Sequence, residues 1–389
     1  MELPLLLLSF LCLCITMSNA ADILRNLDFE TPPANTTANN TSQFLLLTNS
    51  NTIPGWSFNG TVWYVSSGPN ISLPGNGHAV QLGENGKINQ TFGATDDYLQ
   101  YILTFSLTGR REDCFNNSTA VNISVPERSR VFSLQGHFGR NLWETYAFYL
   151  GSWGSKGDSI NLEITSVTTN AATNITCWPI VDTFLVTRNV MPIWYDGNVL
   201  ANGGFEVGPA FLKNSSEGIL LNEEPERFHS PLQEWSIIGT IKYIDSNHYK
   251  VPEGRAAIEL VSGAPSGIQM DLILTVGSPY TLEFTMGDAN DSCMGDFIVY
   301  AQIGTTIQNF TMQSNGTGSA QKHSMMFKAE FTKLTPISIT SFNETRTRDH
   351  VLCGPVIDNV VLRATASYAV KTKLYIGVFS LPLTLLILL

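Results

Sequence analysis

The chain has 389 residues, of which 14% are charged, and its formal net charge at pH 7 is −11. This length favours two domains of roughly 170 residues each over a single domain. The acidic balance disfavours nucleic acid as a partner. The low charged fraction and the 31 Gly residues suit a turn-rich β-sandwich better than a helical bundle.

The N-terminus has the features of an export signal. Residues 3–15 are almost all apolar and are too few to span a bilayer. Ser18 and Ala20 place small side chains at positions −3 and −1 of a cut before Ala21. We therefore predict that residues 1–20 are a signal peptide. The alternative is an uncleaved anchor, because no Lys or Arg precedes the apolar run.

Alternating apolar and polar residues predict strands throughout the remaining chain, and no long stretch shows a helical face. The expected strands are 61–65, 98–108, 159–165, 184–186, 272–275, 280–286 and 297–303. Clusters of Gly, Asn and Pro separate them. The predicted fold class is all-β, with two tandem β-sandwiches of the jelly-roll type.

An internal repeat with a spacing of about 177 residues places the domains at 21–188 and 197–363. The link, 189–196, is short and apolar, so we expect the domains to touch. The repeat begins with Asn-x-x-Phe-Glu and ends with Cys-x-Pro-x-x-Asp. Its matched positions are Asn26 and Asn202, Phe29 and Phe205, Glu30 and Glu206, Trp56 and Trp235, Tyr64 and Tyr243, and Asp182 and Asp358.

Four cysteines lie outside the signal peptide, and each copy of the repeat holds one early and one late. This arrangement favours the disulfides Cys114–Cys177 and Cys293–Cys353 over the two other pairings. Loops of this length imply about 4 kcal/mol of stabilisation each.

Many Asn-x-Ser/Thr sequons in a chain with an export signal predict extensive N-glycosylation. The expected sites are Asn35, Asn59, Asn70, Asn89, Asn122, Asn174, Asn214, Asn290, Asn309, Asn315 and Asn343.

The C-terminal region has the order of a glycolipid (GPI) anchor signal. Ala364, Thr365 and Ala366 are small, residues 367–373 form a polar spacer, and residues 374–389 are apolar. We predict that residues 364–389 are this signal and that the lipid is attached at Ala364. The alternatives are a tail-anchored protein and a simply cleaved one.

The repeated motifs, together with Val251-Pro252-Glu253-Gly254, resemble the plant cell-wall family called domain of unknown function 642. The resemblance implies two galactose-binding-like jelly rolls, and a role in binding wall polysaccharide or modulating pectin methylesterases. The first copy departs from the family pattern, since Cys-Gly-Pro has become Cys177-Trp178-Pro179.

Glu30 and Asp182 open and close the first copy, and Glu206 and Asp358 do so in the second. In carbohydrate-binding jelly rolls the first and last strands often share a calcium ion, which prefers carboxylate and carbonyl oxygens. These four acids are candidate ligands of a structural calcium. The alternative is that they cap turns or accept backbone N–H groups.

Aromatic rings stack on the apolar faces of sugars, so aromatic residues are candidates for carbohydrate binding. Trp56 and Trp235 recur, which favours a place in the core. Trp63, Trp143 and Tyr146 are the sugar-binding candidates, because the second copy has Lys242 at the place of Trp63 and no Trp in the stretch that matches Trp143.

No Gly-x-Ser-x-Gly or His-Glu-x-x-His motif occurs, and the duplication favours a non-catalytic binding protein. Its expected partner is wall polysaccharide, either pectin or a glucan, or a pectin methylesterase. The net charge opposes pectin unless a basic patch attracts it, and Arg110, Arg111, Arg128 and Arg130 are candidates for such a patch. A wall glycoside hydrolase or esterase and a surface signalling protein remain alternatives.

Overall fold

The computed structural model describes most of the two predicted domains. The described residues are 23–34, 42–68, 71, 73, 77–94, 99–109, 114, 119–139, 143–153, 157–168, 177–189, 197–213, 215–261, 265–330 and 334–365. The predicted signal peptide, most of the link and nearly all of the anchor signal lie outside them. Within the described ranges no helix has the length and apolar character needed to cross a membrane.

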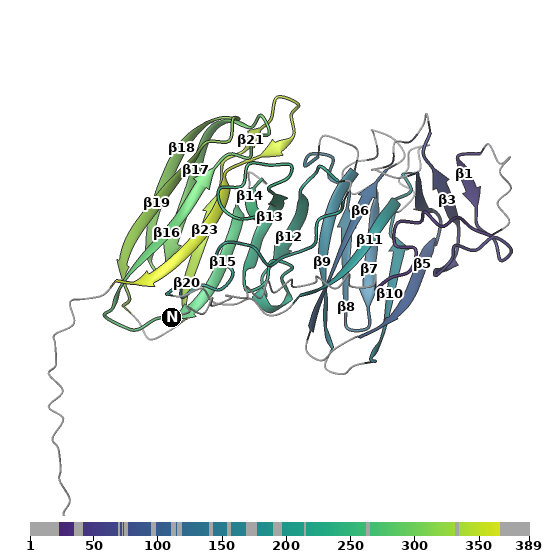
Figure 1. The fold of residues 1–389 in the computed structure, drawn as a ribbon, viewed down its shortest axis with the longest axis horizontal. Coiled ribbons are helices and arrows are strands. Elements are labelled where there is room, and N and C mark those ends of the chain that lie inside the picture. Colours follow the sequence, from purple (N-terminus) through teal and green to yellow (C-terminus); the bar gives the residue numbers. More distant parts are fainter. Residues whose placement is uncertain are drawn as a thin grey trace, which may run out of the picture.

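The first domain is a sandwich of two antiparallel sheets (Figure 1). The sheet that continues into the second domain has the order β1-β3-β4-β11-β6-β9, and the other has the order β2-β5-β10-β7-β8. The strands are β1 (Phe44–Leu46), β2 (Ser57–Asn59), β3 (Val62–Ser66), β4 (His78–Leu82), β5 (Lys87–Gly93), β6 (Leu99–Thr108), β7 (Ala120–Val125), β8 (Arg128–Ser133), β9 (Trp143–Trp153), β10 (Ser159–Ser166) and β11 (Ile180–Asn189).

The second domain repeats this design with the sheets β12-β13-β14-β23-β16-β19 and β13-β15-β20-β17-β18, so that β13 belongs to both. Its elements are β12 (Ile219–Glu224), the 3-10 helix η1 (Arg227–His229), β13 (Ser236–Asp245), β14 (Ala256–Leu260), β15 (Ser266–Ile273), β16 (Pro279–Gly287), β17 (Met294–Ile303), β18 (Thr306–Asn315), β19 (Ala320–Lys328), β20 (Leu334–Ser341), β21 (Thr345–Arg346), β22 (Leu352–Cys353) and β23 (Val356–Ala364).

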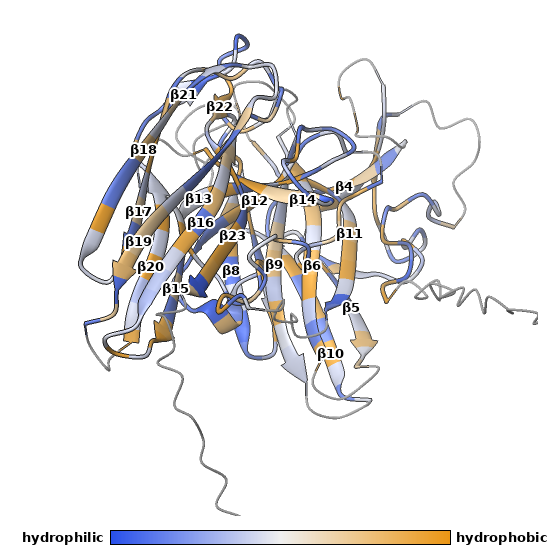
Figure 2. Cartoon of the chain, turned by 60° about the vertical axis from the view of Figure 1, so that its left-hand side comes forward, coloured by the Kyte–Doolittle hydropathy of each residue, from blue (hydrophilic) through white to orange (hydrophobic). Residues whose placement is uncertain are grey.

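The all-β prediction is confirmed, and alternation is its physical basis. In β10, Ile160, Leu162 and Ile164 point into the core while their neighbours are more exposed. Figure 2 shows that apolar and more polar residues alternate along β6 as well, a strand that is mostly buried. One expected strand was misplaced. The run expected at 272–275 is the end of β15, and the chain turns after Ile273.

The recurring aromatic residues build both cores in the same way. The indole N–H of Trp56 donates to the carbonyl of Asn26, and that of Trp235 donates to the carbonyls of Ala201 and Asn202. The hydroxyls of Tyr64 and Tyr243 donate to the carbonyls of Phe29 and Phe205. Both Trp rings are buried, which confirms the expected core role. The repeated motif therefore encodes the fold.

The domains touch, as the apolar link predicts. Strand β12 runs parallel to β9 and pairs Ile219 with Thr145 and Leu220 with Tyr146, so one sheet continues from the first domain into the second (Figure 1). On the same side, Arg128 and Arg130 form ion pairs with Glu224. These two arginines hold the domains together and do not form the free basic patch that we expected. Arg110 and Arg111 lie outside the described residues.

Candidate functional site

The structure contains the disulfides Cys114–Cys177 and Cys293–Cys353, the pairing favoured by the repeat. Each joins the segment that follows β6 or β16 to the segment that precedes the last strand of its domain. The two bonds therefore fix the loops at one end of each sandwich.

The repeated acids hold backbone groups. One carboxylate oxygen of Glu30 accepts the N–H groups of Gly77 and His78 at 3.0 and 2.9 Å. The matching oxygen of Glu206 accepts those of Arg255 and Ala256 at 2.8 and 3.4 Å. Each glutamate thus fastens the segment after Asn-x-x-Phe to the start of β4 or β14.

The repeated aspartates stabilise a bulge in the last strand. Asp182 and Asp358 are buried, and each accepts the N–H of the next residue at 2.6 Å. Those next residues, Thr183 and Asn359, have positive φ angles, and the pairing register shifts nearby. Burial raises the pKa of Asp182 well above its usual range and that of Asp358 to about 7, although hydrogen bonds from backbone N–H groups oppose the rise.

These contacts match the alternative in which the acids accept backbone N–H groups. Among the described residues, the one group of three or more potential metal ligands within 4.8 Å of each other is Glu259, Cys293 and Cys353. Its two cysteines are bonded to each other, so they are not free thiolates. The calcium site at Glu30, Asp182, Glu206 and Asp358 stays a prediction.

Two of the three aromatic candidates lie in the interior. Trp143 is 6% exposed and Tyr146 is 1% exposed, and the Tyr146 hydroxyl donates to the carbonyl of Ser133 and to Glu144. Neither ring face is open to a sugar, so both expectations were wrong. Trp63 is half-buried, and its ring covers Gly83 so closely that a Cβ there would lie 2.4 Å from it. Its role in binding stays a prediction.

The structure reveals a polar pocket of about 280 Å³ beside the disulfide of the second domain. The turn before β12 provides Glu217, and β13 provides Lys242. The turn after β13 provides Tyr249, whose hydroxyl accepts the N–H of Gly218 at 3.1 Å. Asn290 and Asp291 come from the segment before Cys293. The walls are therefore loops that a core strand and a disulfide hold in place.

A buried ion pair lies at the base of this pocket. The Lys242 ammonium is 3.6 Å from the Glu259 carboxylate, and both side chains are almost fully buried. Burial favours the neutral lysine, but Glu259, Tyr249 and Asp291 outweigh it and raise the pKa of Lys242. Burial raises the pKa of Glu259 to about 7, and Lys242 opposes that rise. The lysine therefore stays charged at neutral pH.

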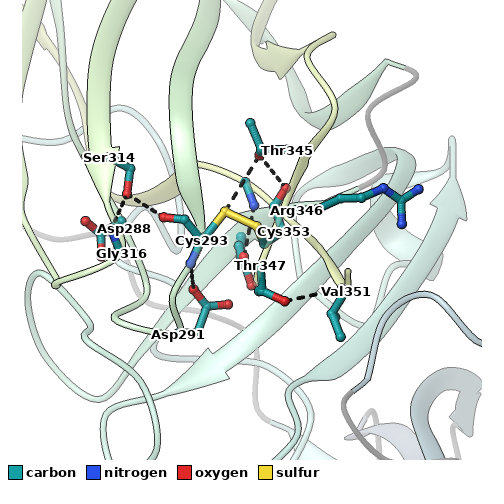
Figure 3. The surroundings of a disulfide bond; sticks show 12 residues. Asp288, Asp291, Cys293, Ser314, Gly316, Thr345, Arg346, Thr347, Val351 and Cys353 are labelled. Carbon is teal, nitrogen blue, oxygen red and sulfur yellow. Dashed lines mark hydrogen bonds between the residues drawn. A yellow bond between two sulfur atoms is a disulfide. The ribbon is translucent and has the colours of Figure 1, made fainter. Parts of the chain in front are cut away.

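The disulfide and its neighbours fix the inner wall (Figure 3). Asp291 accepts the N–H of Cys293 at 3.1 Å, and Glu259 accepts the N–H of Gly354 at 3.0 Å. The other Glu259 oxygen, Oε2, is buried and faces the Lys242 ammonium at 3.6 Å. Only glycine fits at position 354, because a Cβ there would lie 1.9 Å from the carbonyl oxygen of Leu260. Cys353 and Gly354 thus pack against Glu259.

At the matching positions of the first domain there is no such polar pair. Trp63 and Gln81 occupy the cross-strand positions that Lys242 and Glu259 hold in the second domain. Trp63 packs against an apolar cluster that includes Val65, Trp143 and Ile180. The corresponding face of the second domain carries charged groups, so the pocket distinguishes the two copies.

Asn290, one of the expected glycosylation sites, lines the pocket and is exposed. Asn59, Asn309 and Asn315 are exposed as well, whereas Asn89, Asn122 and Asn343 are half-buried. The other expected sites, Asn35, Asn70, Asn174 and Asn214, lie outside the described residues.

Comparison with known proteins places this chain among plant proteins. Residues 22–187 and 198–363 each match the family described as "Protein of unknown function (DUF642)". The Arabidopsis thaliana protein DUF642 L-galactono-1,4-lactone-responsive gene 2 is 33% identical over 89% of this chain and 92% of its own length. Protein TEEBE, also from Arabidopsis thaliana, is 33% identical over 80% of this chain and 84% of its own.

Among solved structures, the tandem CBM22-1-CBM22-2 domain of Paenibacillus barcinonensis Xyn10C covers 82% of this chain and 94% of its own, with 11% identity and a TM-score of 0.28. The module TmCBM61, solved with β-1,4-galactotriose, covers 43% of this chain and 99% of its own, with 15% identity and a TM-score of 0.29. Likeness at this level says nothing about the ligand of this chain.

Proposed function

This chain belongs to the DUF642 family, and on that premise we propose that it is a non-catalytic protein of the plant cell surface that binds a neutral wall polysaccharide. The observation that carries the proposal is the polar pocket of the second domain. Its ligand is a sugar residue held between the Lys242 ammonium and the carboxylates of Glu217 and Asp291.

Sugar hydroxyls suit this pocket because each can both donate and accept a hydrogen bond. The ammonium of Lys242 only donates, and the carboxylates of Glu217 and Asp291 accept. Tyr249 adds a half-buried ring at the wall, against which the C–H face of a pyranose can pack. These donor, acceptor and aromatic groups together therefore suit a polyhydroxylated ligand.

The charges favour a neutral chain over pectin. Three carboxylates, of Glu217, Asp291 and Glu259, surround the single ammonium of Lys242. A uronate would bring a further negative charge to this site and to a protein whose net charge is −11. We therefore place a glucan, or another uncharged wall polysaccharide, ahead of pectin.

Binding fits the geometry better than catalysis. A pKa near 7 is also found for general acids, but Glu259 is fully buried between Lys242 and the disulfide. Both Glu259 and Asp291 hold backbone N–H groups of the disulfide loops. We also propose that a lipid at Ala364 attaches the protein to the outer face of the plasma membrane. The composition of residues 364–389 supports this attachment.

A glycan array with the purified protein tests this function, and it is run with calcium and with a chelator. We expect saturable binding to one class of neutral polysaccharide. The double variant Lys242→Met with Glu259→Gln keeps the side-chain volumes and removes both charges, so it should fold and lose binding at least about tenfold. The matched control, Lys87→Met with Glu163→Gln, removes an ion pair of the first domain in the same way and should keep full affinity.

A blank array would overturn the pocket as a saccharide site and direct the search to a protein partner such as a pectin methylesterase. Release of sugar fragments from the bound polysaccharide would instead support the hydrolase alternative. Binding that survives in the double variant would move the site elsewhere on the molecule.

A further inference from the structure

An apolar surface lies at the end of the second domain that is opposite the pocket. Ile273 is 74% exposed and Leu334 is 64% exposed, and they are directly paired across β15 and β20. Val276, in the turn after β15, is 45% exposed. We call these three residues the apolar end. Soluble domains rarely gather large exposed aliphatic side chains, and such groups mark contact surfaces.

A shallow pocket of about 270 Å³ adjoins the apolar end. Phe327, Leu334 and Pro336 line it, together with one residue of each charge, Lys328 and Glu330. This surface is therefore apolar and close to neutral.

The chain leaves the second domain at the same end. The N–H of Thr365 donates to the carbonyl of Pro279 at 2.8 Å, and Pro279 pairs with Lys328 beside the shallow pocket. In Figure 1 the last strand, β23, ends at this side of the domain. Ala364, the proposed attachment point of the lipid, is the last residue of β23, so the lipid would be held at this end of the domain.

We propose that the apolar end rests on the lipid surface to which the chain is attached. Ile273, Val276 and Leu334 enter the interfacial layer of the bilayer, as exposed aliphatic groups of peripheral proteins do. Tethering within a short distance gives a high effective concentration, so a small patch is enough. The inference rests on the lipid attachment in the proposed function.

This placement orients the binding pocket. Strand β17 begins at Met294, next to Cys293 of the disulfide, and ends at Ile303, which lines the shallow pocket. Ten strand residues span about 30 Å. With the apolar end on lipid, the polar pocket faces away from the membrane and toward the wall.

The test is hydrogen exchange of the lipid-attached protein in phosphatidylcholine nanodiscs, compared with a lipid-free chain that ends at Thr365 in solution. The shorter chain keeps every described core residue, which all lie between Leu24 and Leu362. We expect the amides of residues 273–278 to exchange at least about fivefold more slowly on nanodiscs than in solution. The amides of β8 should exchange equally in both.

The variant Ile273→Ser with Leu334→Ser should enter nanodiscs but lose this protection. The control Leu46→Ser with Val131→Ser changes two exposed aliphatic residues of the first domain and should keep it. Equal exchange of 273–278 on nanodiscs and in solution would overturn the proposal.

Two other occupants of the apolar end give different results, and either overturns the proposal. Protection of the lipid-free chain at every concentration would mean that another part of the same chain covers the surface. Protection that grows with the concentration of the shorter chain would mean a second copy. Absence of a lipid on the protein after its expression in plant cells refutes the attachment itself. Saccharide binding is measured separately and tests the pocket.

Discussion

The ammonium of Lys242 lies 3.6 Å from the carboxylate of Glu259 in the interior of the second domain. Removing one member of a buried ion pair leaves an uncompensated charge, whereas removing both does not. We expect Lys242→Met alone to lower the free energy of unfolding by about 3 kcal/mol at pH 8. The double variant Lys242→Met with Glu259→Gln should cost much less.

Urea unfolding of the wild type, the two single variants and the double variant measures this coupling. Equal losses in Lys242→Met and in the double variant would contradict it, because the cost would then come from packing and not from charge.

Stability should fall as the pH rises from about 4 to 7. The pKa values of Glu259 and Asp358 are each raised to about 7, mainly by burial, while in the unfolded chain such carboxyls titrate near 4. The folded state thus binds their protons more tightly, so the stabilisation is complete below about pH 4 and is lost by about pH 7. We expect a loss of about 2 kcal/mol or more.

Thermal unfolding, followed by circular dichroism between pH 4.5 and 8, gives the change of melting temperature with pH. The melting temperature of the double variant at Lys242 and Glu259 should change less with pH, because Glu259, one of the two titrating groups, is gone. A melting temperature that rises over this range would refute the assignment.

The domain repeat, the disulfide pairs and the cores around Trp56 and Trp235 were accessible from sequence, because each depends on residues that recur. Trp143 and Tyr146 were misjudged for a physical reason. A residue that differs between copies is not needed by the shared fold, yet it can still be buried within its own copy, as Trp143 is beside Val65 and Ile180.

The pocket could not be found from sequence, because Lys242 and Glu259 face each other only through the register of β13 and β14. A weak signal was present. Each is a single charged residue within an otherwise apolar run, Ile-Lys-Tyr-Ile and Ala-Ile-Glu-Leu. A charge in a buried strand demands a partner, and the two strands are neighbours in the chain.

The interface between the domains should depend on Glu224. Its carboxylate is close to the guanidinium groups of Arg128 and Arg130, and burial lowers the pKa of Arg130. We expect Glu224→Ala to destabilise the protein by about 2 kcal/mol and to speed hydrogen exchange in β12. Glu223→Ala is the matched control, since the hydrogen bond from Arg130 goes to the backbone carbonyl of Glu223, which this substitution keeps. Identical behaviour of the two variants would exclude an electrostatic contact between the domains.

Chelation of calcium should leave the folded domains unchanged. Glu30, Asp182, Glu206 and Asp358 already accept backbone N–H groups. We expect the melting temperature in chelator to differ by less than about 2 °C, the shift for 1 kcal/mol in a protein of this size. A larger drop that added calcium reverses, and that Glu206→Gln abolishes, would instead establish the metal site.

Removing each disulfide in turn should show that stability and saccharide binding depend on them differently. Each closes a loop of similar length, with sequence separations of 63 and 60, so replacing either pair by Ala should cost about 4 kcal/mol. Only Cys293–Cys353 lies beside the pocket, where Asp291 accepts the N–H of Cys293 and Glu259 lies within 4.8 Å of both sulfur atoms.

We therefore expect Cys293→Ala with Cys353→Ala to weaken saccharide binding, measured by calorimetry below the melting temperature of both variants. Cys114→Ala with Cys177→Ala should lose as much stability and keep its affinity, because its loops belong to the other domain. Equal affinities in the two variants would mean that the ligand does not touch the disulfide wall, and the site would then have to be sought away from Asp291.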